Sequence, residues 1–242
     1  MTIEEMKRAK RDLGLSNETL SRLSGVPFST VQKFFSGKTL APRQQTLLAL
    51  EKALRTASGN RQGEYTIEDL AKLPDDVHVE LIDGEIFYME APTLVHQIIL
   101  GELHLQFRAC ADKHGKNCRV FLSPCDVQLD NDDKTMVQPD LFVVCREFDM
   151  TRRSFAGAPD LTIEILSDST RSKDMLLKCY KYKNAGVREY WIIDPRRKEV
   201  MVYDFSNEDL QPKKYTFSDT IPVLLSGGEC SIDFSIISEA LS

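Results

Sequence analysis

The sequence contains no run of apolar residues that approaches the roughly 18 needed to cross a membrane. Its opening residues, MTIEEMKRAKRDLG, lack the apolar stretch of a secretory signal peptide. It has no internal repeat, and its 42% hydrophobic and 28% charged residues exclude the disordered and fibrous classes. We therefore expect a soluble, cytoplasmic chain of one or two globular domains that does not associate with a membrane.

The six cysteines are scattered, without a C-x-x-C pair and without a nearby cluster of histidines. Structural zinc sites need closely spaced ligands, so a zinc ribbon is excluded. Cysteines of a chain that is not exported normally stay reduced. The sequence thus predicts free thiols, several of them packed in the core.

Charge is distributed unevenly, although the whole chain carries only −6. Residues 1–60 hold ten Lys and Arg against five Asp and Glu, a net charge of +5, and the remainder carries −11. A basic head on an acidic body indicates a nucleic-acid-binding module joined to a different domain.

Hydrophobic periodicity divides the chain in the same way. Residues 1–57 contain only helical patterns, and the polar stretch 58–64 is the expected linker. Ser16 would cap the start of the second helix, and Gly25 would end it. The last helix, from Pro42 to Ala57, would have Leu47, Leu48, Leu50 and Leu54 as its apolar face. From residue 65 to 242 short apolar runs alternate with helical patterns, and Asp83-Gly84 marks a β-hairpin. The apolar run 136–145 is expected to form one strand. The sequence predicts a small all-α domain followed by an α/β domain.

The segment LSNETLSRLSGVPFSTVQKFFSGK has the pattern of two helices joined by a glycine-containing turn. The second helix, 28–35, would turn Val31 and Phe34 toward the core and could enter the major groove of DNA. The alternative is a plain four-helix bundle that mediates dimerisation. The side chains expected to meet base edges or phosphates are Ser29, Thr30, Gln32, Lys33, Lys38 and Arg43.

Residues 3–55 resemble the Cro/repressor-type (XRE-like) helix-turn-helix family. This resemblance implies that DNA is a partner and, because such modules usually act as dimers, that the chain forms a homodimer. Phe35 departs from the family pattern, since many members carry a Glu there that closes the recognition helix.

Two acidic residues of the body lie in strongly apolar strand patterns. Glu164 is in the middle of LTIEIL, and Asp140 directly precedes LFVVC. Buried carboxylates are costly unless they are paired or bind a cation. On neighbouring strands they would form an oxygen site suited to Mg²⁺, with Lys178 of the next helix as a basic partner. The alternative for Lys178 is a solvated helix face.

The order of these motifs resembles the Uma-type family of restriction endonucleases, which belongs to the PD-(D/E)XK nuclease superfamily. The resemblance covers about residues 65–205 and implies a restriction-endonuclease-like core, in which helices flank a central mixed sheet. It also implies cleavage of phosphodiester bonds with Mg²⁺ or Mn²⁺ as cofactor. The motifs are VELIDGE (79–85), a helix with His96, SPCDVQL (123–129), QPDLFVV (138–144) and the long block 157–195.

The resemblance assigns Asp140 and Glu164 as catalytic metal ligands and Glu80 as a third ligand. Leu166 occupies the place where the superfamily usually has its lysine, so Lys178 would serve as the catalytic lysine from the following helix. Seven further residues are weaker candidates. Turn and cap contacts would equally explain Asp126, Asp168 and Arg171, and ordinary packing would explain His96. A solvated helix face would explain Lys173, Lys181 and Lys183.

Two other functions stay open at this point. The chain could be a DNA-binding transcriptional regulator whose nuclease-like body is inactive and serves assembly, or a phosphodiester enzyme that acts on RNA. The sequence favours the metal-dependent endonuclease, because all three residues of the proposed centre are retained.

Overall fold

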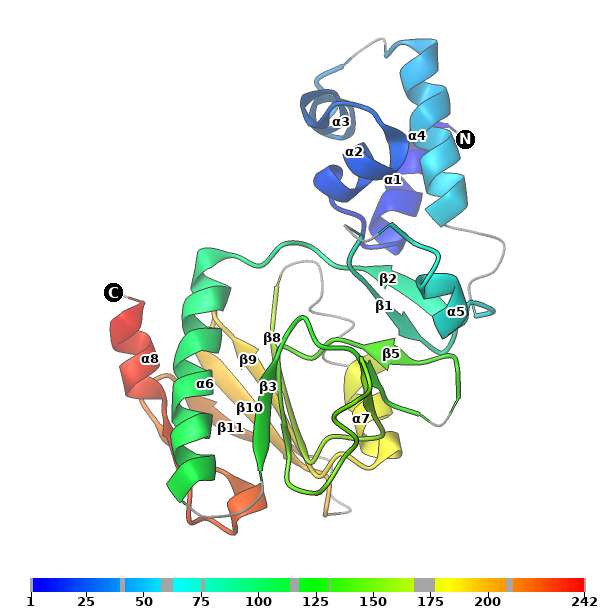
Figure 1. The fold of residues 1–242 in the computed structure, drawn as a ribbon. Coiled ribbons are helices and arrows are strands. Elements are labelled where there is room, and N and C mark those ends of the chain that lie inside the picture. Colours follow the sequence, from blue (N-terminus) through cyan, green and yellow to red (C-terminus); the bar gives the residue numbers. More distant parts are fainter. Residues whose placement is uncertain are drawn as a thin grey trace. The chain divides into compact units, whose positions relative to one another are not determined.

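Figure 1 shows the fold as a computed structural model of the 242-residue chain. The residues it describes are 2–39, 42–57, 63–74, 77–113, 118–130, 132–167, 177–207 and 211–241. The chain divides into two compact units, residues 1–91 with 133–135 and residues 92–132 with 136–242. Most of the expected linker 58–64 lies outside the described residues, so a domain boundary there stays a prediction.

The first unit begins with four helices whose ends match the predicted caps. Ser16 accepts a hydrogen bond from the Thr19 amide at 2.9 Å and so begins the second helix. Gly25 ends that helix at φ 68°, a left-handed conformation that favours glycine. The four helices are α1 (Ile3–Asp12), α2 (Asn17–Ser24), α3 (Phe28–Phe35) and α4 (Gln44–Ala57).

The helical core confirms most of the predicted apolar positions. Val31 and Phe34 of α3 are buried, as expected. The prediction that Leu48 belongs to the apolar face of α4 is wrong, because this side chain is 57% exposed. The buried positions of α4 follow i, i+3, i+4, i+7 spacing, and Leu48 is not on that stripe. They are Leu50, Ala53, Leu54 and Ala57.

The predicted hairpin is present in the first unit, after the short helix α5 (Ile67–Leu70). Strands β1 (Val79–Ile82) and β2 (Glu85–Tyr88) pair antiparallel. Asp83 and Gly84 form the turn between them, with φ of 51° and 77°. A Cβ atom on Gly84 would lie 2.5 Å from the Gly63 carbonyl oxygen, so this position needs glycine for space as well as for conformation.

The second unit is built on a six-stranded mixed sheet in the order β11-β10-β9-β8-β6-β3. Strands β8 and β9 pair parallel and the other neighbours antiparallel. The members of this sheet are β3 (Arg119–Leu122), β6 (Leu141–Val144), β8 (Leu161–Ile165), β9 (Glu189–Asp194), β10 (Glu199–Asp204) and β11 (Lys213–Thr216). Smaller elements are β4 (Val127–Gln128), β5 (Met136–Val137), β7 (Phe155–Ala156), β12 (Thr220–Pro222), η2 (Leu224–Ser226), β13 (Ser231–Asp233) and α8 (Phe234–Ala240).

Helices cover both faces of this sheet (Figure 1). The long helix α6 (Leu94–Lys113) shares a core with Leu161 and Ile163 of β8. The alternate residues of β8 point to the opposite face, where α7 (Cys179–Ala185) places Tyr182 against Glu164. A small helical domain followed by an α/β domain, in which helices flank a central mixed sheet, is therefore confirmed. Within the described ranges, no helix is both long and apolar enough to span a bilayer.

Two local expectations need correction. Pro139 divides the apolar run 136–145 into β5 and β6, because proline cannot donate a sheet hydrogen bond. The prediction of free thiols holds for Cys125 and Cys179 only. The other four cysteines form two disulfides, Cys110–Cys230 and Cys118–Cys145, whose partners are 120 and 27 residues apart in the chain. Sequence spacing carries no signal for such long-range pairs.

Candidate active site

The pairing of β6 with β8 brings together the two carboxylates singled out in the sequence. The last paired position is Leu141 opposite Ile163, so the next residue on each side places Asp140 beside Glu164. Asp140 Oδ2 accepts a hydrogen bond from the Ile165 main-chain N–H at 2.7 Å. The prediction that Asp140 and Glu164 lie on adjacent strands of one mixed sheet is confirmed.

Glu164 is held by two side chains from the segment that packs on this face. Lys178 Nζ and Tyr182 Oη each lie close to Glu164 Oε1, at 2.8 and 2.7 Å. Glu164 and Lys178 are almost completely buried, with relative exposures of 4% and 2%. A charged pair this deep is favourable only with close geometry and further hydrogen bonds, and Tyr182 supplies one of them. The expected approach of Lys178 to the carboxylate is thus present.

His96, for which the sequence favours ordinary packing, contacts Asp140. It lies in the first turn of α6, and its Nε2 is 3.0 Å from Asp140 Oδ1. Only 12% of its side chain is exposed. Its Nδ1 is buried and has no hydrogen-bond partner among the residues that the structure describes. The imidazole and the Ile165 amide therefore contact different oxygens of the Asp140 carboxylate and together restrict its orientation.

The donor atoms at this point suit a hard divalent cation. Mg²⁺ is usually bound by one or two carboxylates, with waters and substrate phosphate completing the shell. Asp140 and Glu164 provide such a pair, and the buried Nδ1 of His96 is a polar atom that lacks a partner within the described ranges. Three His, Cys, Asp or Glu side chains do not gather at metal-binding distance in the described part of the chain. The donor set among the described residues thus fits a cation that takes two carboxylates and completes its shell with water and substrate.

Two of the other acidic candidates, Glu80 and Asp126, lie among the described residues. Glu80 is completely buried on β1 of the first unit, and its role as a third ligand stays a prediction. Asp126 Oδ1 accepts a hydrogen bond from Gln138 Nε2 at 2.7 Å, a contact within the loops around β4 and β5. Asp168 and Arg171 lie outside the described residues.

The lysines expected on a solvated face behave differently from one another. The prediction that Lys181 lies on a solvated face is wrong. Its Nζ lies 2.7 Å from Asp130 Oδ2, and its side chain is only 11% exposed. Lys183 is half-buried and forms no ion pair among those recorded for the described residues. Lys173 lies outside the described part of the chain. Burial raises the pKa of the neighbouring Cys179 thiol, which keeps that sulfur neutral next to Lys178.

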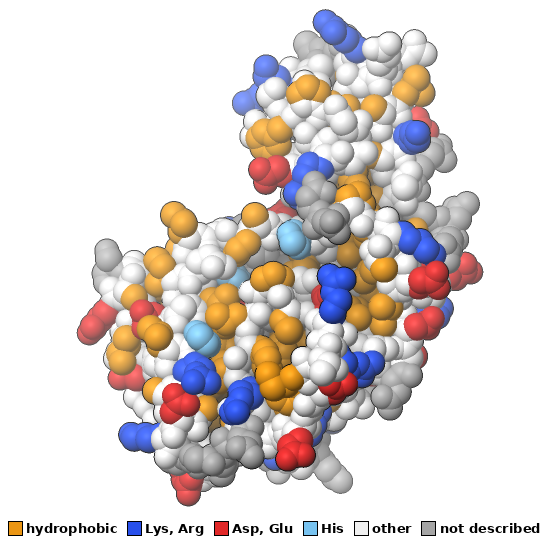
Figure 2. Space-filling view, viewed as in Figure 1, with side chains coloured by type: hydrophobic (Ala, Val, Ile, Leu, Met, Phe, Trp, Pro, Cys, Tyr) orange, Lys and Arg blue, Asp and Glu red, His pale blue; other side chains and the backbone are white. Residues whose placement is uncertain are grey.

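The helical domain presents the expected polar side chains to solvent. Ser29, Gln32 and Lys33 are exposed on α3, and Thr30 is half-buried. Lys38 and Arg43 are exposed in the segment that follows. Lys and Arg side chains are spread over the visible surface of this domain, with fewer acidic ones between them (Figure 2). The surface of α3 thus has the composition of a recognition helix.

Phe35, which departs from the repressor pattern, has a packing role. Its ring meets Phe34 edge to face at 4.9 Å between centroids, and Lys10 Nζ lies 5.5 Å from its centroid. Burial lowers the pKa of Lys10, an effect that Glu90 partly offsets. The helix ends without a glutamate, because Ser36 donates its main-chain N–H to the Gln32 carbonyl.

Comparison with known protein families agrees with both halves of this geometry. The model of the Uma2 family of putative restriction endonucleases matches residues 67–234, well over half of the chain. The chain belongs to the Uma2 family. A helix-turn-helix family model matches residues 6–58, which contain all four helices of the first domain except the start of α1.

Two individual proteins resemble this Uma2 chain over much of its length. The uncharacterized protein slr1290 of Synechocystis sp. is 26% identical over 156 residues, which are 64% of this chain and 80% of that protein. The crystal structure of a putative nuclease belonging to DUF820 from Anabaena variabilis superposes with a TM-score of 0.62 at 23% identity. That match covers 73% of this chain and 99% of the other, and it shows a common fold.

Proposed function

We propose that this Uma2 protein is an Mg²⁺- or Mn²⁺-dependent endonuclease that its helix-turn-helix directs to DNA. The observation that carries the proposal is the cluster in which Asp140 and Glu164 stand on adjacent strands and Lys178 contacts Glu164. This combination of two carboxylates and one lysine fits metal-assisted phosphodiester hydrolysis.

Asp140 and Glu164 would hold the cation, which on binding polarises the scissile phosphate and acidifies a bound water. Lys178 would offset the negative charge that develops on the phosphate, because its buried ammonium lies beside the carboxylate pair. His96 would keep Asp140 oriented toward the cation through the 3.0 Å contact to its Oδ1. His96 is thus proposed as a positioning residue.

The proposal is tested by incubating the purified chain with supercoiled plasmid, single-stranded DNA and single-stranded RNA, with Mg²⁺ or with a chelator. We expect the plasmid to be nicked or linearised with the metal and to stay intact with the chelator. Cleavage of RNA alone would assign the site to a different substrate. Intact substrates in every metal-containing reaction would favour the DNA-binding regulator with an inactive body.

Duplex binding by the helical domain gives an independent prediction. Lys33→Ala in the full chain should weaken duplex binding and reduce the slope of log affinity against log salt by about 0.9, the loss of one phosphate contact. Lys52→Ala is the matched control, because Lys52 is exposed on α4 and away from α3. Fluorescence anisotropy between 50 and 300 mM salt measures both variants. Equal slopes for the wild type and Lys33→Ala would contradict the assigned recognition surface.

The orienting role of His96 predicts a graded series of variants. His96→Ala should reduce cleavage about 10- to 100-fold and weaken metal binding, as for other residues that position a ligand. His96→Gln should recover part of both losses, since its amide can donate to Asp140. His104→Ala on the same helix is the control and should match the wild type. Calorimetric titration with Mn²⁺, alongside cleavage rates, checks the series; unchanged metal affinity in His96→Ala would refute the role.

We also propose that the chain acts as a homodimer, because helix-turn-helix modules commonly bind two half-sites about one helical turn apart. Sedimentation equilibrium tests this directly, and a monomer at micromolar concentration would contradict it.

A further inference from the structure

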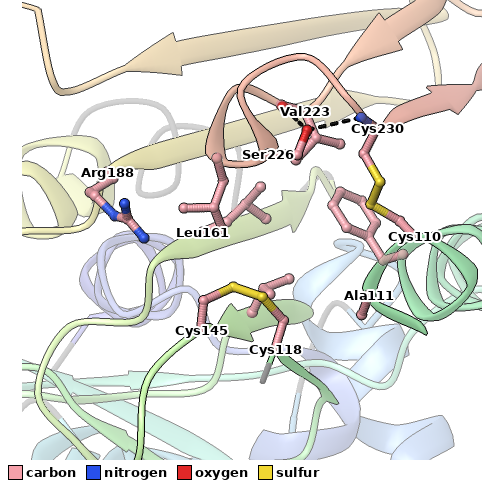
Figure 3. A pocket seen from close by; sticks show the side chains of 12 residues that line it. Cys110, Ala111, Cys118, Cys145, Leu161, Arg188, Val223, Ser226 and Cys230 are labelled. Carbon is pink, nitrogen blue, oxygen red and sulfur yellow. Dashed lines mark hydrogen bonds between the residues drawn. A yellow bond between two sulfur atoms is a disulfide. The ribbon is translucent and has the colours of Figure 1, made fainter. Parts of the chain in front are cut away.

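The second unit contains a cavity that the proposed nuclease chemistry does not use. It has a volume of about 240 Å³ and lies between the end of α6, the start of β8 and the turn that carries η2 (Figure 3). Its walls are mostly apolar, and two disulfides form part of them. Besides the cysteines, the apolar lining residues are Phe107, Ala111, Val143, Leu161, Val223 and Leu225.

Two disulfides join the elements that form the cavity. Cys110–Cys230 ties α6 to the segment before β13, and Cys118–Cys145 ties the start of β3 to the end of β6. The hydroxyl of Ser226 is already used, because it donates to the Val223 carbonyl and accepts from the Cys230 N–H. A mostly apolar cavity whose one hydroxyl is already hydrogen-bonded favours a mostly apolar ligand.

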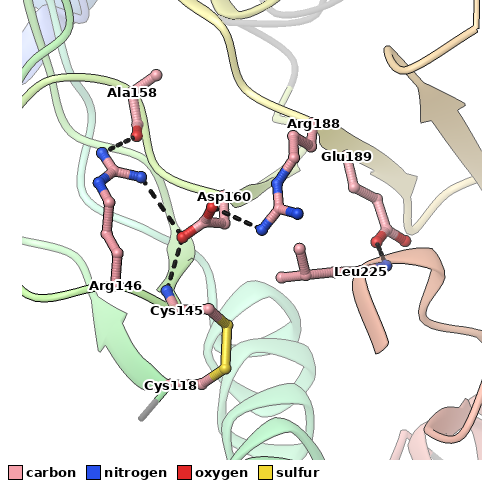
Figure 4. Close-up of polar contacts among 8 residues, drawn as sticks. All are labelled: Cys118, Cys145, Arg146, Ala158, Asp160, Arg188, Glu189 and Leu225. Atoms are coloured by element: carbon pink, nitrogen blue, oxygen red, sulfur yellow. Dashed lines mark hydrogen bonds and ion pairs between the residues drawn. A yellow bond between two sulfur atoms is a disulfide. The ribbon is translucent and has the colours of Figure 1, made fainter. Parts of the chain in front are cut away.

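One charged side chain, Arg188, completes the lining. Its Nη2 donates to Asp160 Oδ1 at 2.7 Å, and 54% of its side chain is exposed (Figure 4). Asp160 also accepts from the Cys145 N–H at 2.6 Å and faces Arg146 at 3.5 Å. Two guanidinium groups thus share one carboxylate, which leaves an excess positive charge at the rim of the cavity.

The adjacent Glu189 contacts donors other than Arg188. Its carboxylate accepts hydrogen bonds from Trp191 Nε1 and from the main-chain N–H groups of Leu224 and Leu225. Burial raises the pKa of Glu189, and these three hydrogen bonds act against that shift. The carboxylate contacts of Glu189 within the described residues are thus with these donors, and none is with Arg188.

We propose that this cavity is a binding site for a small apolar carboxylate. The apolar part would lie among Phe107, Leu161 and Val223, and the carboxylate would pair with Arg188. A volume of about 240 Å³ corresponds to about eight waters at roughly 30 Å³ each, so a ligand of about eight to ten non-hydrogen atoms fits. Benzoate is a suitable probe, and benzyl alcohol is its uncharged counterpart. This site is independent of the proposed nuclease function.

The experiment measures binding of both probes to the full chain by NMR titration, after each variant has been checked for folding by circular dichroism. We expect saturable benzoate binding with a Kd of about 0.1–1 mM, the range for a ligand of this size. Arg188→Gln should weaken benzoate at least fivefold and change benzyl alcohol less than twofold. Equal effects on the two probes would overturn the assignment of a carboxylate ligand.

A matched pair of variants tests the location of the site. Ala111→Phe should fill the cavity and abolish binding of both probes. Ala109→Phe should leave the binding of both probes unchanged, because Ala109 is exposed on the same helix and does not line the cavity. If Ala111→Phe fails to fold, the location of the site is tested in the wild type instead, by nuclear Overhauser contacts between benzoate and Phe107. Absence of saturable binding, absence of those contacts, or undiminished binding to a folded Ala111→Phe would overturn the proposal.

Discussion

Asp140→Asn and Glu164→Gln are each expected to lower the rate of DNA cleavage by about 10²- to 10³-fold. Each change removes one ligand charge from the proposed cation, and a bound metal contributes several kcal/mol of transition-state stabilisation. Cleavage and Mg²⁺ affinity should therefore fall together. Duplex binding should change little, because the predicted DNA contacts lie in the helix-turn-helix.

This pair of variants is measured by single-turnover cleavage and by calorimetric titration with Mn²⁺. Asp149→Asn is the matched control, because its carboxylate bonds the Thr151 amide and hydroxyl in an exposed turn. The control should cleave at the wild-type rate. A folded Asp140→Asn or Glu164→Gln that cleaves normally would remove that residue from the catalytic centre.

Lys178→Met should lower the cleavage rate about as much as the two carboxylate variants do. Unlike those variants, it should not weaken Mg²⁺ binding. An ammonium 2.8 Å from a proposed ligand repels an incoming cation, so its removal should leave Mg²⁺ affinity unchanged or increased. The loss of cleavage reflects the missing positive charge in the transition state. Lys178→Arg should recover the rate only in part, since a planar guanidinium cannot place one donor where a compact ammonium stood.

Lys178→Met should also lower the free energy of unfolding, and this effect needs a separate control. Removing one partner of a buried pair typically costs about 3–5 kcal/mol, because the other charge stays buried and unpaired. The double variant Glu164→Gln with Lys178→Met should regain much of that stability and stay inactive. Lys183→Met should resemble the wild type in urea unfolding and in cleavage. An active Lys178→Met beside an inactive Lys183→Met would show that the lysine was assigned wrongly.

Local physical rules made several features predictable from the sequence. Ser16 caps the start of α2 because a side-chain oxygen is needed to accept a main-chain N–H there, and Gly25 ends the helix because a left-handed residue is needed at that end. Asp83-Gly84 specified the hairpin for a similar reason. Asp140 and Glu164 were identifiable because a carboxylate in a buried strand needs a compensating partner, and Lys178 provides one for Glu164.

Features that depend on tertiary packing were not predictable in this way. His96 approaches Asp140 only because α6 packs on the sheet and brings together residues 44 positions apart. Lys181 has the same helical context as Lys183 but finds Asp130, 51 residues earlier. The Cys110–Cys230 pair spans 120 residues and follows from the docking of the C-terminal segment on α6. Periodicity and motif spacing contain no information on such contacts.

The most direct test of the account compares the wild type with Asp140→Asn, purified by the same procedure, in a time course on supercoiled plasmid at several Mg²⁺ concentrations. We predict Mg²⁺-dependent conversion of the plasmid by the wild type and a rate at least about 100-fold lower for the variant at saturating metal. Equal rates for the two proteins, or a wild type that leaves the plasmid intact at every Mg²⁺ concentration while it binds the duplex, would contradict the account.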